Sequence, residues 1–236
     1  MIRARLIAVL LLSLVIGGCS LSGEDDDDPE PTAISAPIDA DVASGCWTAE
    51  NRALPVTLPG DSQGQQWKSA PAMAIDTSRN YVARVETDQG VFEMTLLPQL
   101  APNTVNNFVC LAWAGYFDNT TFHRIIAGFV VQGGDPLGTG TGNPGYTFDD
   151  EPVNQPYTRG TVAMANSGSN SNGSQFFVSL ADGNLAPSYT IFGEVSNGIE
   201  VVDKIATFPT SGLQGNPIQS DPVKVETITI TEVERN

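Results

Sequence analysis

The feature that most constrains the fold is a series of short strand-like runs separated by loops rich in Gly, Asn and Ser. The runs concentrate Val, Ile, Thr and Phe. Two of them are joined by Asp88-Gln89-Gly90, a hairpin signal with Gly at the tight position. We therefore predict strands at Tyr81–Thr87, Val91–Leu97, 128–132, 161–164, 175–180, 190–194 and Val223–Val233.

Two segments interrupt this pattern with helical character. In 102–114 a proline suits the first turn, Val105 and Phe108 are spaced for one apolar face, and Gly115 ends the helix. A second helix is predicted over 198–206. Many short strands with two helices favour a closed antiparallel barrel, because closure removes exposed strand edges. Periodicity alone leaves a β-rich barrel and a sandwich as alternatives.

Two blocks carry the functional signal. The first, 122–135, reads Phe-His-Arg-Ile-Ile-Ala-Gly-Phe-Val-Val-Gln-Gly-Gly-Asp, and it places Arg124, Phe129 and Gln132 around a short strand that leaves a turn. The second, 164–177, reads Met-Ala-Asn-Ser-Gly-Ser-Asn-Ser-Asn-Gly-Ser-Gln-Phe-Phe. Together they resemble the two signature blocks of the cyclophilin family of peptidyl-prolyl cis-trans isomerases.

The resemblance extends from about residue 80 to the C-terminus, with further similar runs in the family's order at 101–108, 115–122, 148–151 and 189–193. It implies a mainly β domain over 72–236, built as a closed eight-stranded antiparallel β-barrel capped by two α-helices. It also implies that the protein is a peptidyl-prolyl cis-trans isomerase acting on proline-containing unfolded or extended polypeptides.

The implied reaction is rotation about an Xaa-Pro bond, which resonance makes slow. Rotation leaves a lone pair on the prolyl nitrogen, and a guanidinium beside it can donate to that lone pair only in the twisted state. Arg124 matches this arginine, and the resemblance groups it with Phe129 and Gln132 as catalytic residues. Gln132 is expected to brace Arg124 and to bind a substrate carbonyl.

The remaining matches form a proline slot and a groove for the substrate backbone. Phe177 is expected to face the slot, while its neighbour Phe176 points into the barrel, because side chains alternate along a strand. The predicted substrate-binding residues are Val130, Ala165, Asn166, Phe177, Leu185 and Tyr189.

Three positions depart from the family or invite another reading. Asn184 stands where many members have a tryptophan, so weak cyclosporin binding is expected, and Tyr189 replaces a common pocket histidine. His123, the single histidine, resembles a structural family residue. A lone histidine cannot build a metal site, so we predict no metal and no cofactor.

The N-terminus is predicted to be a lipoprotein signal peptide over 1–18. Arg3 and Arg5 precede an apolar run, 6–16, that is too short to span a bilayer as a stable helix. The run ends in Ile-Gly-Gly-Cys, which resembles a bacterial lipobox with Cys19 as the lipid attachment site. The alternative is an ordinary signal peptide with an incidental cysteine.

Residues 19–45 are predicted to be an acidic disordered tether, and 46–71 an N-terminal extension partly packed on the domain. An exported chain lies where disulfides persist, so Cys46 and Cys110 are a candidate pair. Against this pairing, Cys110 lies in a predicted helix and could be an ordinary buried residue.

The formal net charge of −16 argues against nucleic acid and anionic membrane surfaces as partners. We expect a monomer in the bacterial envelope, anchored to the cell membrane by lipid and assisting the folding of exported proteins. One alternative is a binding module, a proline-recognising holdase whose turnover is incidental. The other is a scaffold for assembly of the envelope. The scaffold would need a large exposed apolar patch, and the sequence offers no clear one.

Overall fold

The structure is a computed structural model. It describes residues 45–48, 54–57, 63–183, 185–208, 210–211, 216–217 and 222–233, all within a compact unit that runs from Ala33 to Asn236. The predicted signal peptide, Cys19, the tether before Gly45, and Asn184 therefore lie outside the described residues. No helix within the described ranges is long and apolar enough to cross a membrane.

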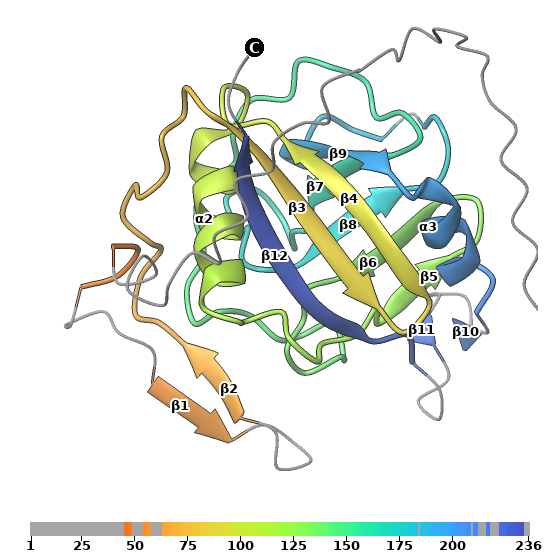
Figure 1. Cartoon of the computed structure of the whole chain (residues 1–236), viewed down its shortest axis with the longest axis horizontal. Coiled ribbons are helices and arrows are strands. Elements are labelled where there is room, and N and C mark those ends of the chain that lie inside the picture. Colours follow the sequence, from red (N-terminus) through yellow and green to blue (C-terminus); the bar gives the residue numbers. More distant parts are fainter. Residues whose placement is uncertain are drawn as a thin grey trace, which may run out of the picture. The chain divides into compact units, whose positions relative to one another are not determined.

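The centre of the fold is an antiparallel sheet of eight strands in the order β12-β3-β4-β9-β7-β8-β6-β5 (Figure 1). Seven of the strands match predicted runs, and β5 is an addition. The strands are β3 (Asn80–Thr87), β4 (Gly90–Leu96), β5 (Arg124–Ile126), β6 (Val130–Gly133), β7 (Thr161–Met164), β8 (Phe176–Ser179), β9 (Ile191–Asn197) and β12 (Val225–Val233).

The closed barrel predicted from the sequence is wrong. The sheet is an open, curled half-barrel, because its end strands β12 and β5 share no ladder in the described part of the chain. A single bridge, Thr121 with Lys224, joins the segments that precede these strands. The backbone N–H of Phe122 also donates to the carbonyl of Val223 at 3.0 Å. The three residues of β5 all pair with β6 on its other side.

The two helices lie close to their predicted positions, α2 at Pro102–Trp113 and α3 at Ile199–Ile205. Ala101 provides no side-chain cap for α2. Instead the Glu151 carboxylate accepts hydrogen bonds from the backbone N–H groups of Asn103 and Thr104, at 3.0 and 2.8 Å. An anion at this end also complements the helix dipole.

The sheet buries apolar side chains in two clusters. The larger cluster lies between the sheet and the helices. In it the ring centroid of Phe108 lies 5.5 Å from that of Phe176 and 5.2 Å from that of Phe192. The smaller contains Phe177 and Ile191 and is the one that borders the predicted slot. The alternation predicted for Phe176 and Phe177 is therefore confirmed.

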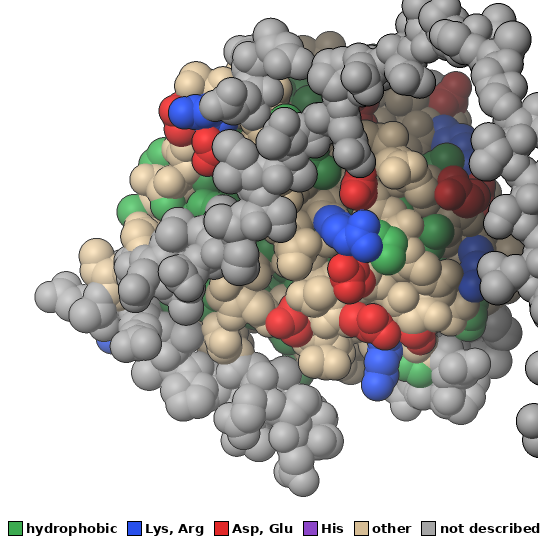
Figure 2. Space-filling view, in the orientation of Figure 1, with side chains coloured by type: hydrophobic (Ala, Val, Ile, Leu, Met, Phe, Trp, Pro, Cys, Tyr) green, Lys and Arg blue, Asp and Glu red, His purple; other side chains and the backbone are tan. Residues whose placement is uncertain are grey.

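The outer surface over β3 and β4 is charged. Figure 2 shows acidic and basic side chains intermixed on the face that β12, β3 and β4 present in Figure 1. Arg84 on β3 contacts the carboxylates of Glu86 and Glu93, at 3.1 and 3.7 Å. These pairs are well exposed, so each contributes little to stability.

The segment before the domain packs on it and is covalently attached to it. Cys46 and Cys110 form a disulfide with a Cα–Cα distance of 5.8 Å, so α2 holds the extension directly. The backbone N–H of Ala72 donates to the carbonyl of Cys46 at 2.8 Å. A small hairpin, β1 (Leu54–Thr57) with β2 (Gln63–Gln66), lies within this extension, and a second, β10 (Thr210–Ser211) with β11 (Asn216–Pro217), precedes β12.

Candidate active site

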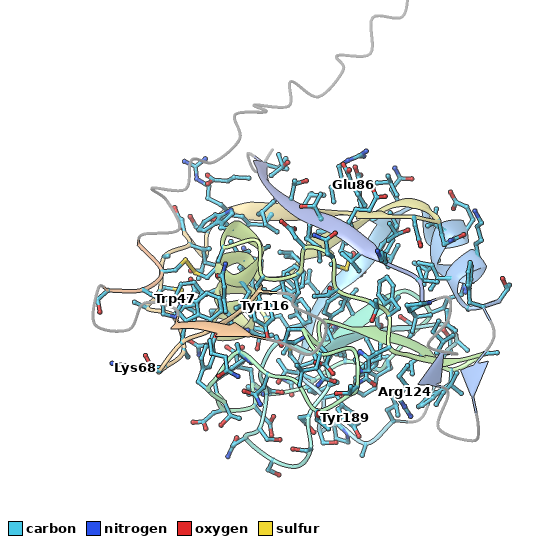
Figure 3. All side chains as sticks on the ribbon, turned by 90° about the horizontal axis from the view of Figure 1, so that it is seen from below. Trp47, Lys68, Glu86, Tyr116, Arg124 and Tyr189 are labelled. Carbon is cyan, nitrogen blue, oxygen red and sulfur yellow. A yellow bond between two sulfur atoms is a disulfide. The ribbon has the colours of Figure 1, made fainter. Side chains whose placement is uncertain are left out.

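The nine residues predicted for catalysis and substrate binding line a single pocket of about 410 Å³, which we call the slot. Its other lining residues are His123, Thr139 and Gly140. In Figure 3 the labelled Arg124 and Tyr189 lie on the lower side of the molecule, opposite Glu86 on the charged surface of the sheet. The predicted lining residues are Arg124, Phe129, Val130, Gln132, Ala165, Asn166, Phe177, Leu185 and Tyr189.

Strand register brings the central three residues together. Arg124 on β5 pairs with Gln132 on β6, and Gln132 pairs with Phe177 on β8. Directly paired residues of an antiparallel sheet project from the same face. The sequence therefore places a cation, an amide and an aromatic ring in one row across three strands. Phe129 precedes β6, with 38% of its surface exposed at the mouth of the slot.

The apolar wall of the slot is built around Phe177. Its ring meets that of Tyr189 edge-on, with centroids 5.7 Å apart, an arrangement that aromatic rings favour. Val130 and Leu185 also line the slot, and the smaller apolar cluster lies behind it. Tyr157 fixes the Tyr189 segment, because its hydroxyl donates to the carbonyl of Tyr189 at 2.8 Å. The pocket can hold a compact apolar ring.

A line of amides holds the polar wall. Arg124 Nη1 donates to Gln132 Oε1 at 3.1 Å, and Gln132 Nε2 donates to Gln175 Oε1 at 3.0 Å. Gln175 Nε2 in turn donates to the carbonyls of Gly140 and Gly142, at 3.1 and 2.9 Å. The position of the guanidinium is thus connected to a loop eight residues beyond Gln132.

Asp135 shapes that loop from inside the protein. Its carboxylate is fully buried and accepts hydrogen bonds from the backbone N–H groups of Leu137 and Thr139 at 2.7 and 3.0 Å, and from that of Gly140. A buried carboxylate is stable only with such partners. A side chain at Gly142 would overlap Asp135 Oδ1, so this loop requires glycine there.

His123 lies beside this network, with only 3% of its surface exposed. Its Nε2 is 3.5 Å from Gln132 Nε2. Burial lowers the pKa of His123 from its usual value of 6.5, since desolvation disfavours the charged form, and nearby Arg124 lowers it further. The Asp135 carboxylate opposes this shift in pKa. A neutral imidazole fits the structural role predicted from the sequence, although one edge of the residue also lines the slot.

A second pocket, also of about 410 Å³, adjoins the slot and shares Gln132, Gly140, Ala165 and Asn166 with it. We call it the side pocket. Asn166 stands at the boundary, where its Nδ2 donates to the carbonyl of Ser188 at 2.7 Å. The side pocket is lined by small and amide-bearing residues and has no aromatic ring in its wall, unlike the slot. Its remaining lining residues are Thr141, Gly142, Asn143, Thr147, Ser167, Ser171, Gly173, Ser174 and Gln175.

Sequence reasoning missed the side pocket together with Gln175 and Asp135. Gln175 lies within the second sequence block, as the first residue of the predicted strand 175–180, so its place beside a site segment was a usable signal. Asp135 closes the first block and precedes a Gly-rich stretch, a pattern typical of a side chain that caps a turn. Among the described residues, no group of three or more His, Cys, Asp or Glu side chains is arranged to hold a metal ion.

Comparison with known proteins agrees with this geometry. The family described as "Cyclophilin type peptidyl-prolyl cis-trans isomerase/CLD" matches residues 82–235. Peptidyl-prolyl cis-trans isomerase B of Streptomyces anulatus is 43% identical over 171 residues, covering 63% of this chain and 95% of the relative. A probable peptidyl-prolyl cis-trans isomerase B of Mycobacterium tuberculosis is 42% identical over 160 residues, covering 61% of this chain and 51% of the relative.

Solved structures show the same relationship. A cyclophilin type peptidyl-prolyl cis-trans isomerase from Cryptosporidium parvum aligns with a TM-score of 0.60 and 35% identity, over 64% of this chain and 97% of that one. The same type of protein, solved in the presence of the dipeptide Ala-Pro, aligns with a TM-score of 0.59 and 34% identity, over 66% of this chain and 99% of that one.

Proposed function

Because this chain belongs to the cyclophilin type peptidyl-prolyl cis-trans isomerases, we propose that Arg124 carries its reaction, the rotation of an Xaa-Pro peptide bond. The observation that supports this role is the row formed by Arg124, Gln132 and Phe177 across three paired strands. It sets a guanidinium held by Gln132 beside the apolar wall of the slot, whose volume of about 410 Å³ has room for a proline ring.

The chemistry needs no bond to be made or broken. Rotation of the amide removes its resonance, and the barrier for a peptide bond is about 18–20 kcal/mol. In the twisted state the prolyl nitrogen gains a lone pair, to which Arg124 donates a hydrogen bond. The planar amide offers no such acceptor, so the interaction stabilises the transition state selectively. Arginine suits the task because it stays charged and presents rigid donors.

The slot holds the proline while the chain on one side of the bond turns. Phe177 and Leu185 contact the ring, and Phe129 covers it at the mouth. Gln132 has two tasks, to brace the guanidinium through its Oε1 and to bind a substrate carbonyl. Ala165 and Asn166 line the path of the substrate backbone. The side chains that act on the amide are thus separate from those that grip the ring.

Substitution of Arg124 tests this role. Removal of one donor of this kind costs roughly a hundred- to thousandfold in rate. Arg124→Ala should therefore lower kcat/KM by that amount while peptide binding falls much less, and Arg124→Lys should recover only part of the loss. Phe177→Ala is the matched control, because it opens the slot and should weaken binding and turnover together. A protease-coupled proline-isomerisation assay measures turnover, and calorimetry measures binding.

Near-normal turnover of folded Arg124→Ala would refute the mechanism. The proline-recognising holdase would then be the better account, since it needs the slot but no transition-state donor. A wild-type chain that binds proline peptides without accelerating their isomerisation would favour the same alternative.

We further propose that the protein is a lipid-anchored monomer outside the cytoplasm that assists the folding of exported proteins. The lipobox-like sequence before Cys19 supports the anchor, and the Cys46–Cys110 disulfide is typical of an oxidising compartment. Mass spectrometry of the mature protein tests the proposal. A chain that begins at an acylated Cys19, and a Cys19→Ser variant that stays an unacylated precursor, are the expected results. A mature chain that begins elsewhere and carries no lipid would contradict it.

A further inference from the structure

We propose that Trp67, in the extension before the domain, is a positioning residue for the side pocket and thereby helps to set which residues next to proline this protein accepts. The inference rests on the isomerase function above, since it concerns how the protein recognises substrate residues that lie outside the slot. Trp67 itself lines neither the slot nor the side pocket. It lies behind the side pocket, where it supports two of that pocket's walls by separate contacts.

The first contact is with the loop that forms one wall. The backbone N–H of Trp67 donates to the carbonyl of Pro144 at 2.8 Å, directly after the lining residue Asn143. The two backbones are in close contact, because a Cβ at Gly145 would lie 2.5 Å from the carbonyl oxygen of Trp67. Gly145 also has φ of +95°, a conformation that favours glycine. The loop therefore takes its shape against the backbone of the extension.

The second contact reaches another lining residue of the side pocket, Ser174, through an aromatic ring. The indole of Trp67 lies 5.7 Å from the ring of Tyr116, at an interplanar angle of 50°. The Tyr116 hydroxyl is 3.2 Å from Ser174 Oγ, which donates to the carbonyl of Gly134 at 2.7 Å. Ser174 lines the side pocket and is itself buried. A shift of the indole would thus reach Ser174 through one intervening side chain.

Trp67 can position these walls because it is itself held firmly. Only 4% of its surface is exposed, and it stacks on Trp47 with centroids 4.4 Å apart and planes at 17°. Trp47 Nε1 donates to the carbonyl of Ser69 at 3.1 Å, and the adjacent Cys46 is bonded to Cys110 on α2. Figure 3 shows Trp47 and Tyr116 on the same side of the domain, away from Arg124. The extension therefore supports the side pocket without entering it.

The position of the side pocket gives this support a functional meaning. The side pocket shares four lining residues with the slot, so a polypeptide with proline in the slot places a neighbouring side chain in or near it. Successive residues of an extended chain are about 3.3 Å apart, so the side chains in reach are those within two or three positions of proline. If its walls shift, discrimination at such a position should change while the rotation step remains intact.

The test compares substrate preference in three variants of the full chain. Trp67→Phe shortens the ring that contacts Tyr116 and leaves the backbone contact with Pro144 in place. Tyr116→Phe removes only the hydroxyl that reaches Ser174, so it folds even where the tryptophan change does not. Ile228→Ala on β12 is a stability control, because Ile228 is buried in the main core and lines neither pocket. The substrates are a blocked Ala-Pro dipeptide and six-residue peptides that vary one position at a time on each side of proline.

The wild-type chain should prefer some side chains over others at one position. In Trp67→Phe and Tyr116→Phe, kcat/KM for the favoured side chain at that position should fall through KM by roughly two- to tenfold, the size expected for one lost hydrogen bond. Turnover of the dipeptide should stay within about twofold, because it reaches only the slot. Ile228→Ala should lower the melting temperature and leave the preference unchanged.

Three results would overturn the inference. The first is an unchanged preference in folded Tyr116→Phe and Trp67→Phe. The second is an equal loss of turnover on every peptide, the dipeptide included, since that is what a general loss of structure produces. The third is a wild-type chain that shows no preference at any position. Failure of the proposed function gives a different result, because the wild-type chain would then isomerise none of the peptides.

Discussion

The disulfide between Cys46 and Cys110 makes a quantitative prediction about stability. The bond closes a loop with a sequence separation of 64. In the chain-entropy description, closing such a loop lowers the entropy of the unfolded chain by about 14.5 cal/mol/K, which is about 4.3 kcal/mol at 25 °C. Because a domain of this size has a free energy of unfolding of only about 5–15 kcal/mol, this one bond is a large share of the total.

Urea unfolding measures the effect, with Cys19→Ser in every protein so that the remaining thiols are those of the pair. The reduced wild-type chain should lose about 4 kcal/mol of unfolding free energy relative to the oxidised chain. Cys46→Ala/Cys110→Ala should lose somewhat more, because both cysteines are fully buried and the smaller side chains leave a cavity. Addition of dithiothreitol should destabilise the wild-type chain and leave the double variant unchanged.

The reasoning is refuted if oxidised and reduced wild-type chains differ by less than about 1 kcal/mol, near the bottom of the range observed for disulfides. Such a result would mean that the 46–110 segment is already restricted in the unfolded chain. The same small difference in unfolding free energy would also arise if the extension gained other contacts in the folded, reduced protein. An unchanged slope of the unfolding free energy against urea in the reduced protein would favour the first explanation, because the unfolded chain would then expose no additional surface.

Three further predictions concern single residues. Burial lowers the pKa of His123 below 6.5, so the histidine of the unfolded chain takes up a proton first as the pH falls. The free energy of unfolding should therefore decline by at most about 1.4 kcal/mol per pH unit, down to the pKa of the folded state. Urea titrations from pH 7.5 to 5 should show this loss in the wild-type chain and a smaller one in His123→Asn; identical pH profiles would contradict it. Glu151→Ala should lower the free energy of unfolding by about 0.5–2 kcal/mol through loss of the cap on α2, with Glu151→Gln recovering part of it, and no change on either substitution would remove the capping role. Gly142→Ala should lower the free energy of unfolding by about 1–3 kcal/mol, because the new Cβ overlaps Asp135. Gly183→Ala is the control and should melt close to wild type, because the nearest atom to its Cβ is 4.0 Å away. Equal stabilities of the two variants would show that the loop relaxes freely.

Strands and helices could be predicted where their signals are local. Pro102 and Gly115 mark the ends of α2, and the alternation of Phe176 and Phe177 places one ring in the main core and the other in the slot. The closed barrel was wrong because ladder closure depends on residues far apart in the sequence. The segment 119–122, which lies outside the regular strands, meets 223–226 at the start of β12, and no periodicity marks such a contact.

The candidate site likewise contains residues that could be predicted from the sequence and residues that were missed. Its lining residues could be predicted because the two sequence blocks carry them at fixed spacing, and register then assembles Arg124, Gln132 and Phe177. Gln175, Asp135 and the side pocket were missed. Gln175 and Asp135 act through backbone groups of a Gly-rich loop, and only their places in the two blocks signal them. The pairing of the two cysteines likewise depended on a packing contact of the extension, which composition alone left open.

The disulfide also decides how the protein responds to mechanical load. A force applied to the N-terminus of the chain passes covalently from Cys46 to Cys110, so the chain between them carries no tension while the bond is intact. The 64 residues of this loop, including β3 and β4, correspond to about 210–230 Å of extended chain that cannot be drawn out. In a protein tethered by its N-terminus, pulling would therefore act on α2 from within the domain, and β3 and β4 would be spared.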